Sequence, residues 1–187
     1  MSRCINILDT DIEGLYVLER DLLGDKRGYL ERLFCSDELT ALIADKRIEQ
    51  INRTLTEARH TVRGMHFQYP PYAEIKLVSC LQGEVLDVAV DVRAGSPTFL
   101  KWHAEVLSAE NHRSLLIPEG FAHGFQTLTD KCELIYFHTA SYEASAEGGL
   151  NPLDPRLSID WPAPVSCLSD RDAGHPYLDE GFLGVEI

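Results

Sequence analysis

Short segments in which polar and apolar residues alternate dominate the middle of the chain. In the most regular of them, Leu86, Val88 and Val90 alternate with Asp87 and Asp91. A period of two places these two sets on opposite faces of a β-strand. We expect the apolar face to point to a core and the two aspartates to form a solvated face.

Similar segments follow one another from residue 76 to residue 139, with turn residues between them. The pattern predicts strands at Lys76–Leu81, Glu84–Val92, Phe99–Leu107, Arg113–Ile117 and Cys132–Thr139. Short strands at such regular spacing favour an all-β sandwich or barrel. The sequence has no Gly-rich phosphate loop between a strand and a helix, which argues against a dinucleotide-binding α/β fold.

One helix is predicted, beginning at Ser36. Ser36 is a good N-cap residue, Glu38 adds negative charge to the first turn, and Leu39, Leu42 and Ile43 keep helical spacing. This segment is the only clear helical signal in a chain that otherwise reads as strand and turn.

The chain has no internal repeat or Pro/Ser-rich linker, so we expect one domain over residues 1–187. Its N-terminal part, about residues 1–45, is expected to supply strands. From about residue 143 the periodicity is lost and Pro, Asp, Ser and Gly become frequent. This tail either wraps the surface or contributes to a functional site.

Composition excludes some classes of function. The chain has 17 Lys and Arg against 30 Asp and Glu, a formal net charge of −13, which disfavours nonspecific binding to nucleic acid. The five cysteines are odd in number and lack Cys-x-x-Cys spacing, as expected in a reducing compartment. The N-terminus lacks a signal-peptide pattern, and no apolar run is long enough to span a membrane. We therefore expect a cytoplasmic protein without a nucleic-acid or membrane partner.

Two motifs suggest chemistry. Residues 118–123 match Pro-x-Gly-x-x-His, the second signature of cupin barrels, and end at His123. The region of the first signature keeps His66 but has Gln68 where a second histidine is usual. His66, Glu74 and His123 could form a two-histidine, one-carboxylate metal site, the alternative being a metal-dependent oxygenase or isomerase.

The favoured interpretation is an acid–base site without metal. Lys76 lies two residues after Glu74 on a predicted strand, so both side chains share a face. An ammonium group there would repel a divalent ion. A histidine that titrates near neutral pH can remove a proton, and a fixed cation can stabilise the enolate that results.

Short sequence blocks that match the pattern of one family run through nearly the whole chain in the same order. They are Gly24–Gly28, Gln50–Thr56, Arg63–Gln68, Lys76–Val78, Gly83–Arg93, Leu107–Asn111, Ile117–Phe125, Ile159–Trp161 and Ser169–Asp172. On these blocks the chain resembles the dTDP-4-dehydrorhamnose 3,5-epimerases, small homodimeric cupins of sugar-nucleotide metabolism. The resemblance covers about residues 18–178.

The resemblance implies an isomerase with a cupin (double-stranded β-helix) jelly roll, few short helices, and neither cofactor nor metal. Its substrate would be a nucleotide-diphosphate-linked 4-keto-6-deoxyhexose, in the first place dTDP-4-dehydro-6-deoxy-D-glucose, inverted at C3 and C5 or at C3 alone. The 4-keto group acidifies both C–H bonds. A base on one face of the sugar ring removes a proton and an acid on the other face returns one.

The resemblance also implies roles for individual residues. His66 would be the base, oriented by Asp172. Tyr136 would be the acid, and Lys76 would stabilise the enolate. The substrate-binding residues would be Arg27, Arg63, Gln50, Asn52, His123 and Arg171, with the arginines holding the diphosphate. The family forms homodimers that exchange N-terminal strands, so the partner would contribute to the nucleotide pocket.

Three departures from the family pattern stand out. Arg32 occupies the position where the family has a nucleotide-binding Glu, and the acid has moved to Glu31. Ser79 replaces a frequent Arg, and Pro152 lies in a stretch that has lost its Trp. A one-residue shift on a strand reverses the direction of the side chain. These changes leave open which nucleotide and which sugar are used.

Overall fold

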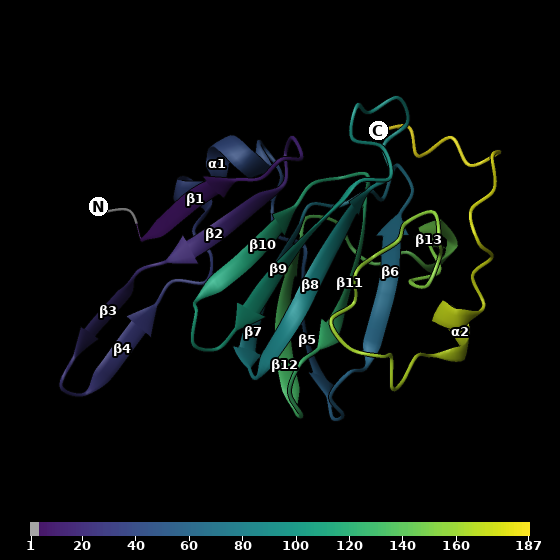
Figure 1. The fold of residues 1–187 in the computed structure, drawn as a ribbon. Coiled ribbons are helices and arrows are strands. Elements are labelled where there is room, and N and C mark those ends of the chain that lie inside the picture. The colour runs from purple at the N-terminus through teal and green to yellow at the C-terminus, as the bar shows by residue number, and fades with distance from the viewer. Residues whose placement is uncertain (1–3) are drawn as a thin grey trace.

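The computed structural model describes residues 4–187, in which antiparallel strands predominate (Figure 1). The elements in chain order are β1 (Ile5–Asp9), β2 (Tyr16–Arg20), β3 (Leu22–Asp25), β4 (Gly28–Glu31), α1 (Ser36–Ile43), β5 (Gln50–Thr56), β6 (Val62–Gln68), β7 (Lys76–Gln82), β8 (Glu84–Asp91), β9 (Trp102–Ser108), β10 (Arg113–Ile117), β11 (Phe121–Thr127), β12 (Cys132–His138), a 3₁₀ turn (Ala144–Ala146), β13 (Glu147–Gly149) and α2 (Asp170–Ala173). The N-terminal sequence that predicts no signal peptide begins with residues 1–3, outside the described range.

Two sheets face each other. The larger has the strand order β1-β2-β10-β7-β12-β5 and the smaller the order β13-β6-β11-β8-β9. Consecutive strands β7 and β8 fall in different sheets, as do β10 and β11 and β11 and β12, so the chain repeatedly crosses between them. This crossing is the topology of a jelly roll, and the predicted all-β cupin fold is confirmed.

The predicted strands agree closely with the observed ones. Arg113–Ile117 has the predicted bounds, and β7, β8 and β12 each begin at the predicted residue and end within one residue of the predicted end. The exception is β9, which begins at Trp102 instead of Phe99. The backbone N–H of Phe99 bonds to the carbonyl of Ser96, and Leu100 has a φ of 63°, so these residues form a turn.

The prediction of a solvated face on β8 is wrong. Asp87 and Asp91 are both fully buried. Asp91 accepts hydrogen bonds from Arg93, Ser96 and Thr98, and these bonds offset the free-energy cost of burying its carboxylate. The alternation is present, but both faces of this strand are covered, one by the opposite sheet and one by other parts of the chain.

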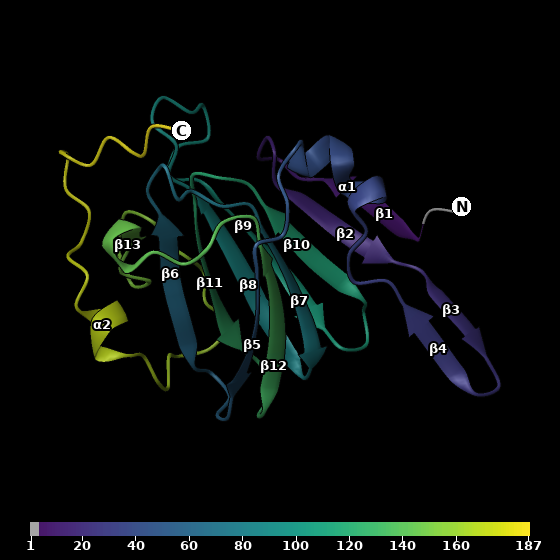
Figure 2. The same ribbon diagram turned by 180° about the vertical axis from the view of Figure 1, so that it is seen from behind.

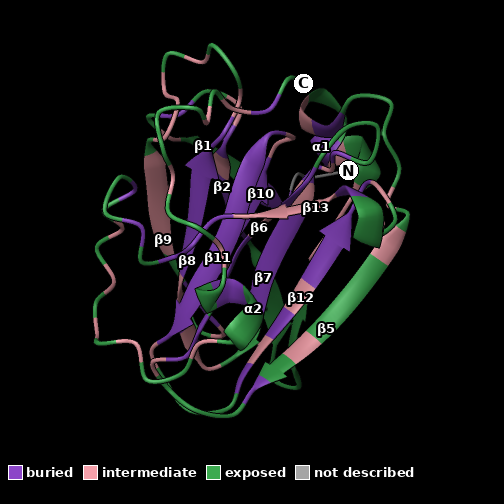
Figure 3. Cartoon of the chain, turned by 90° about the vertical axis from the view of Figure 1, so that its right-hand side faces the viewer, coloured by how far each residue is buried: buried purple, intermediate pink, exposed green. Residues whose placement is uncertain are grey.

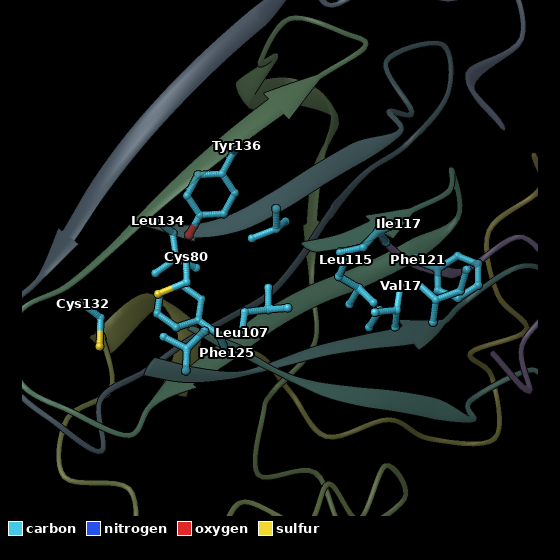
Figure 4. Close-up of a cluster of buried hydrophobic side chains, with 14 of the residues drawn as sticks. Val17, Cys80, Leu107, Leu115, Ile117, Phe121, Phe125, Cys132, Leu134 and Tyr136 are labelled. Atoms are coloured by element: carbon cyan, nitrogen blue, oxygen red, sulfur yellow. The ribbon is translucent and has the colours of Figure 1, made fainter. Parts of the chain in front are cut away.

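Three hydrophobic clusters account for this burial. One fills the space between the sheets and includes Tyr136 (Figure 4). A second covers the outer face of the smaller sheet, where Leu150, Leu157 and Val185 of the C-terminal tail pack against Val88. Figure 3 shows the result: β8, β10 and β11 are mainly buried, whereas β5 is largely exposed.

The third cluster lies under α1, which covers the outer face of the larger sheet through Leu39 and Ile43. The helix begins where predicted, but its N-cap is Cys35 and has no side-chain capping bond. Ser36 is therefore the first helical residue. The carboxylate of Glu38 accepts hydrogen bonds from the backbone N–H groups of Cys4 and Ile5 and so links α1 to β1.

Two segments extend beyond the sheets. The β3–β4 hairpin projects away from them in both views of the chain (Figures 1 and 2). The tail after β12 runs along β6, where it forms β13 and α2 (Figure 1). Among residues 4–187 no helix has the length and apolar character needed to cross a membrane.

The positions that depart from the family pattern have structural partners. Glu31 accepts a 2.6 Å hydrogen bond from Arg20, while Arg32 pairs with Glu38. Ser79 lies on the larger sheet, where the Arg20 guanidinium is 3.4 Å away. The carbonyl of Pro152 accepts the indole N–H of Trp161 at 2.9 Å. Glu31 and Arg32 therefore tie the hairpin to the body of the protein.

Candidate active site

Strand register places the candidate residues on two facing walls. In the smaller sheet, His66 of β6 is paired with His123 of β11. In the larger sheet, β12 pairs with its neighbours so that Tyr136 lies beside Asn52. A cavity of about 560 Å³ is lined by side chains from both sheets.

Gly64 allows β6 and β11 to approach closely. It has a φ of +114°, a region that favours glycine. A Cβ atom at this position would lie 2.6 Å from the Cα of Gly124 and 2.6 Å from the carbonyl oxygen of His123. Gly64 lies two residues before His66, so this close contact holds β11 against β6 beside the candidate site.

Replacing Gly64 with alanine is therefore expected to lower the free energy of unfolding by about 3 kcal/mol, through crowding and backbone strain. Differential scanning calorimetry should show the melting temperature falling by about 6–12 °C. Gly95 is the matched control, because it also has a positive φ (+72°) but no atom within 4 Å of its Cβ position. Equal losses in Gly64→Ala and Gly95→Ala would contradict the role of the close contact.

The carboxylate of Asp172 holds the ring of His66. His66 Nε2 lies 2.8 Å from Asp172 Oδ1, and Asp172 Oδ2 accepts the Gly64 N–H at 3.1 Å. Ser169 fixes this aspartate because its hydroxyl oxygen accepts the Asp172 backbone N–H. With Nε2–H donating to Asp172, the other ring nitrogen, Nδ1, has no protein partner in residues 4–187 and can accept a proton.

The environment of Asp172 favours its ionised form. Burial raises the pKa of this carboxyl group, but the hydrogen bonds from His66 and Gly64 outweigh burial and hold the pKa well below its usual value. The negative charge can therefore persist beside an imidazolium. If His66 accepts a proton and becomes positively charged, the negative charge of Asp172 beside it stabilises that imidazolium.

The same pKa shift predicts a pH dependence of stability. Ionised Asp172 stabilises the folded chain fully above its unfolded pKa of about 4, and this contribution is lost as the pH falls towards the lower folded pKa. The wild type is expected to be more stable than Asp172→Asn near pH 6, with the difference narrowing below about pH 4. Urea unfolding at several pH values measures it, with the exposed Asp160→Asn as control. A difference that stayed constant down to pH 2 would contradict the shift.

Arg171 lies against the same histidine. Its Nη1 donates to Glu147 of β13 at 3.1 Å, and its Nη2 is 2.9 Å from His66 Nε2, which cannot accept this N–H while it donates its own proton to Asp172. The guanidinium is more than half exposed at the cavity. An exposed guanidinium at the cavity is what the anion-binding role implied by the family resemblance would require, and that role stays a prediction.

The facing wall supplies an ammonium group and a phenol. Lys76 begins β7, and its Nζ lies 3.2 Å from Oε1 of Glu74. The Tyr136 ring is buried, and its hydroxyl lies 3.4 Å from Thr54 Oγ1. Burial raises the pKa of Tyr136, so the phenol keeps its proton at neutral pH and can act as a proton donor.

The three residues of the metal-dependent alternative have separate partners. His66 pairs with Asp172, whereas His123 Nε2 lies 2.8 Å from Oδ1 of Asp87. Glu74 is engaged by a lysine and by another histidine. Within the described part of the chain no cluster of three His, Cys, Asp or Glu side chains could hold a metal ion. The donor set therefore does not fit the metal site considered from the sequence.

Most of the predicted substrate-binding residues gather at the cavity. Asn52, Arg63, His123 and Arg171 line it, and Gln50 lines an adjoining cavity of about 300 Å³. Arg27 does not lie there: it is at the tip of the β3–β4 hairpin, 83% exposed and paired with Asp25.

Sequence reasoning missed two residues at the site. Asp87 was assigned to the solvent, although it is the carboxylate that holds His123. His138 was not considered, although it lines both cavities and follows Tyr136 by two residues on β12. The two-residue period of a strand is the signal that places His138 on the same face as Tyr136.

A jelly roll whose two sheets carry a carboxylate-bound histidine and a buried tyrosine on opposite walls of one cavity is typical of a cupin-type enzyme that transfers protons. The family model for dTDP-4-dehydrorhamnose 3,5-epimerase matches residues 9–180, and the chain belongs to this family. The predicted resemblance and the predicted enzyme class, an isomerase, are thereby confirmed.

Individual relatives agree with this assignment. The dTDP-4-dehydrorhamnose 3,5-epimerase of Shigella flexneri is 38% identical, over 96% of this chain and 99% of its own. The dTDP-4-dehydrorhamnose 3-epimerase of Streptomyces niveus is 36% identical, over 86% of this chain and 78% of its own. The crystal structure of the Legionella pneumophila dTDP-6-deoxy-D-glucose-3,5-epimerase, in complex with dTDP-4-keto-L-rhamnose, has a TM-score of 0.90 at 37% identity, covering 98% of both chains.

Proposed function

We propose that this protein inverts C3 and C5 of dTDP-4-dehydro-6-deoxy-D-glucose, a nucleotide-linked 4-keto-6-deoxyhexose, without a metal or cofactor. The observation that carries the proposal is the position of His66 and Tyr136 on opposite walls of one cavity. Inversion of a carbon requires a base on one face of the sugar and an acid on the other. The structure of the Legionella pneumophila relative, with its bound dTDP-4-keto-L-rhamnose, supports this class of substrate.

The chemistry uses three groups in turn. His66 removes the proton next to the ketone, and the electron pair of the broken C–H bond passes into an enolate whose charge is on the C4 oxygen. The Lys76 ammonium stabilises that charge. Tyr136 then protonates the carbon from the opposite face, after which solvent restores the proton of the tyrosine and removes the one on the histidine.

The remaining polar side chains suit the rest of the substrate. Arg63 and Arg171 supply guanidinium groups that can bind a diphosphate in a bidentate manner. His123, Gln50 and Asn52 offer hydrogen bonds at the sugar end. These roles would place the charged part of the substrate near the C-terminal tail and the sugar between the two sheets.

The active form is proposed to be a homodimer, in which Arg27 enters the partner's site. The hairpin that carries Arg27 exposes Leu23, Tyr29 and Leu30, each more than half accessible. An apolar surface of this kind is stabilised when another chain covers it. Sedimentation should give twice the chain mass of 21.0 kDa, and a monomer would contradict the dimer.

We further propose that one domain carries the whole function and that it works in the cytoplasm, where scattered cysteines stay reduced.

Proton NMR in deuterium oxide tests the proposed reaction. The protein is incubated with dTDP-4-dehydro-6-deoxy-D-glucose, and the C3 and C5 proton signals are followed. Loss of both signals with formation of the inverted sugar is the expected result. Loss of the C3 signal alone would make the protein a 3-epimerase, as its Streptomyces niveus relative is named. If neither signal faded with dTDP, CDP or GDP as carrier, the proposal would be overturned.

A further inference from the structure

Besides His66–Asp172 and His123–Asp87, another histidine–carboxylate pair lies beside the tyrosine, and the proposed reaction does not use it. His138 Nδ1 is 2.7 Å from Oε2 of Glu74. Each side chain is only 11% exposed. His138 faces the cavity from the end of β12, two residues after Tyr136. An ionisable pair withdrawn from water costs free energy, so its place next to the reacting groups calls for a function.

Glu74 also contacts the ammonium group of the site. Its Oε1 lies 3.2 Å from Lys76 Nζ, while its other oxygen is bound to His138. Burial raises the pKa of Glu74, but the hydrogen bond from His138 and the charge of Lys76 outweigh it, so the pKa is lowered and the carboxylate is ionised. One fixed carboxylate therefore holds both the lysine and the histidine.

The His138 ring in turn packs on the tyrosine. The two rings are nearly parallel, at 20°, with centroids 6.0 Å apart. On another side His123 meets Tyr136 edge to face, at 71° and 6.1 Å. Within residues 4–187 the phenol has one hydrogen-bond partner, the Thr54 hydroxyl, at the long distance of 3.4 Å. Two ring contacts and one long hydrogen bond therefore orient Tyr136.

We propose that Glu74 and His138 form a positioning pair that fixes the Lys76 ammonium and the Tyr136 phenol relative to each other. This inference rests on the proposed function. The pair acts through its two neighbours: Glu74 holds the group that stabilises the enolate, and His138 holds the group that protonates it from the far face. Contact between His138 Nε2 and Asn52 Nδ2, at 3.4 Å, limits the ring on its remaining edge.

The consequence concerns the fate of the enolate. Once formed, it is protonated either by Tyr136, which inverts the carbon, or again on the original face by His66, which restores the substrate. In deuterium oxide the second route yields deuterated substrate without inversion, once the proton on His66 has exchanged with the solvent. A well-oriented Tyr136 favours the first route, so the pair should raise the ratio of inverted product to deuterated substrate.

The experiment measures this ratio by NMR for the wild type, His138→Ala, Glu74→Ala and His103→Ala. Because both products form on the same enzyme molecules, the ratio does not depend on how much of a variant is folded. His138→Ala and Glu74→Ala are expected to lower it about tenfold, a change of about 1.4 kcal/mol in relative barrier. His103 is the matched control: it faces the inside of the barrel from β9 and lines neither cavity.

A ratio in both variants equal to that of the wild type would overturn the inference, as would an equal fall in His103→Ala. Should His138→Ala not accumulate as folded protein, His138→Asn keeps a polar group at the position and gives the same readout. Failure of the proposed function is distinguished by the wild type, which would then yield neither inverted product nor deuterated substrate.

Discussion

Replacing His66 with asparagine is expected to lower the rate of epimerisation by about a thousandfold or more, within the range that general acid–base catalysis contributes. Asparagine can still hydrogen-bond to Asp172, but it cannot accept a proton from carbon. Deuterium incorporation into the substrate should fall by the same factor, since no enolate forms. Proton NMR in deuterium oxide measures both quantities in one experiment.

The fold should survive this substitution, because the His66 side chain is 26% exposed and its backbone remains within β6. Circular dichroism and the melting temperature provide the control, compared with His103→Ala. A His66→Asn variant that retained substantial deuterium incorporation would show that another group is the base.

Replacing Tyr136 with phenylalanine is expected to have a different effect on the same two quantities. Formation of inverted product should fall by about 10²- to 10⁴-fold, because the far-face proton donor is lost. Deuterium incorporation should continue, since His66 and Lys76 remain in place. The variant would therefore exchange protons without inverting the carbon.

Phenylalanine preserves the ring contacts with His123 and His138 and loses only the hydroxyl group with its long bond to Thr54. Melting temperatures within a few degrees of the wild type should confirm that the core is intact. Inverted product formed at the wild-type rate would show that the proton comes from elsewhere, such as water. Both substitutions thus test opposite walls of the same cavity.

The strands with clear two-residue alternation could be predicted from the sequence, and β10 has the predicted bounds. The strands β6 and β11 could not, since both are buried along most of their length and lack alternation. The close contact of Gly64 with Gly124 depends on two segments 60 residues apart and leaves no local signal. The same is true of the short strand β13 in the tail.

The residues of the candidate site could also be predicted only in part from the sequence. The alternation on β8 reveals two faces of the strand but does not say which of them lies inside. It therefore predicts a surface position for Asp87, although this side chain is fully buried. Motif matching and strand spacing point to His66 and Lys76, whereas only the family resemblance points to Tyr136 and Asp172. The structure brings all four to one cavity. Their catalytic roles stay predictions until the substitutions above are measured.

The contact between His66 and Asp172 joins residues 106 positions apart, and every barrel strand from β1 to β12 precedes Asp172 in the chain. During synthesis on the ribosome the barrel strands are complete before the carboxylate that orients the histidine has been translated. If His66 is the base as proposed, the nascent barrel therefore lacks the carboxylate that orients it until the C-terminal tail has been made and has docked on β6.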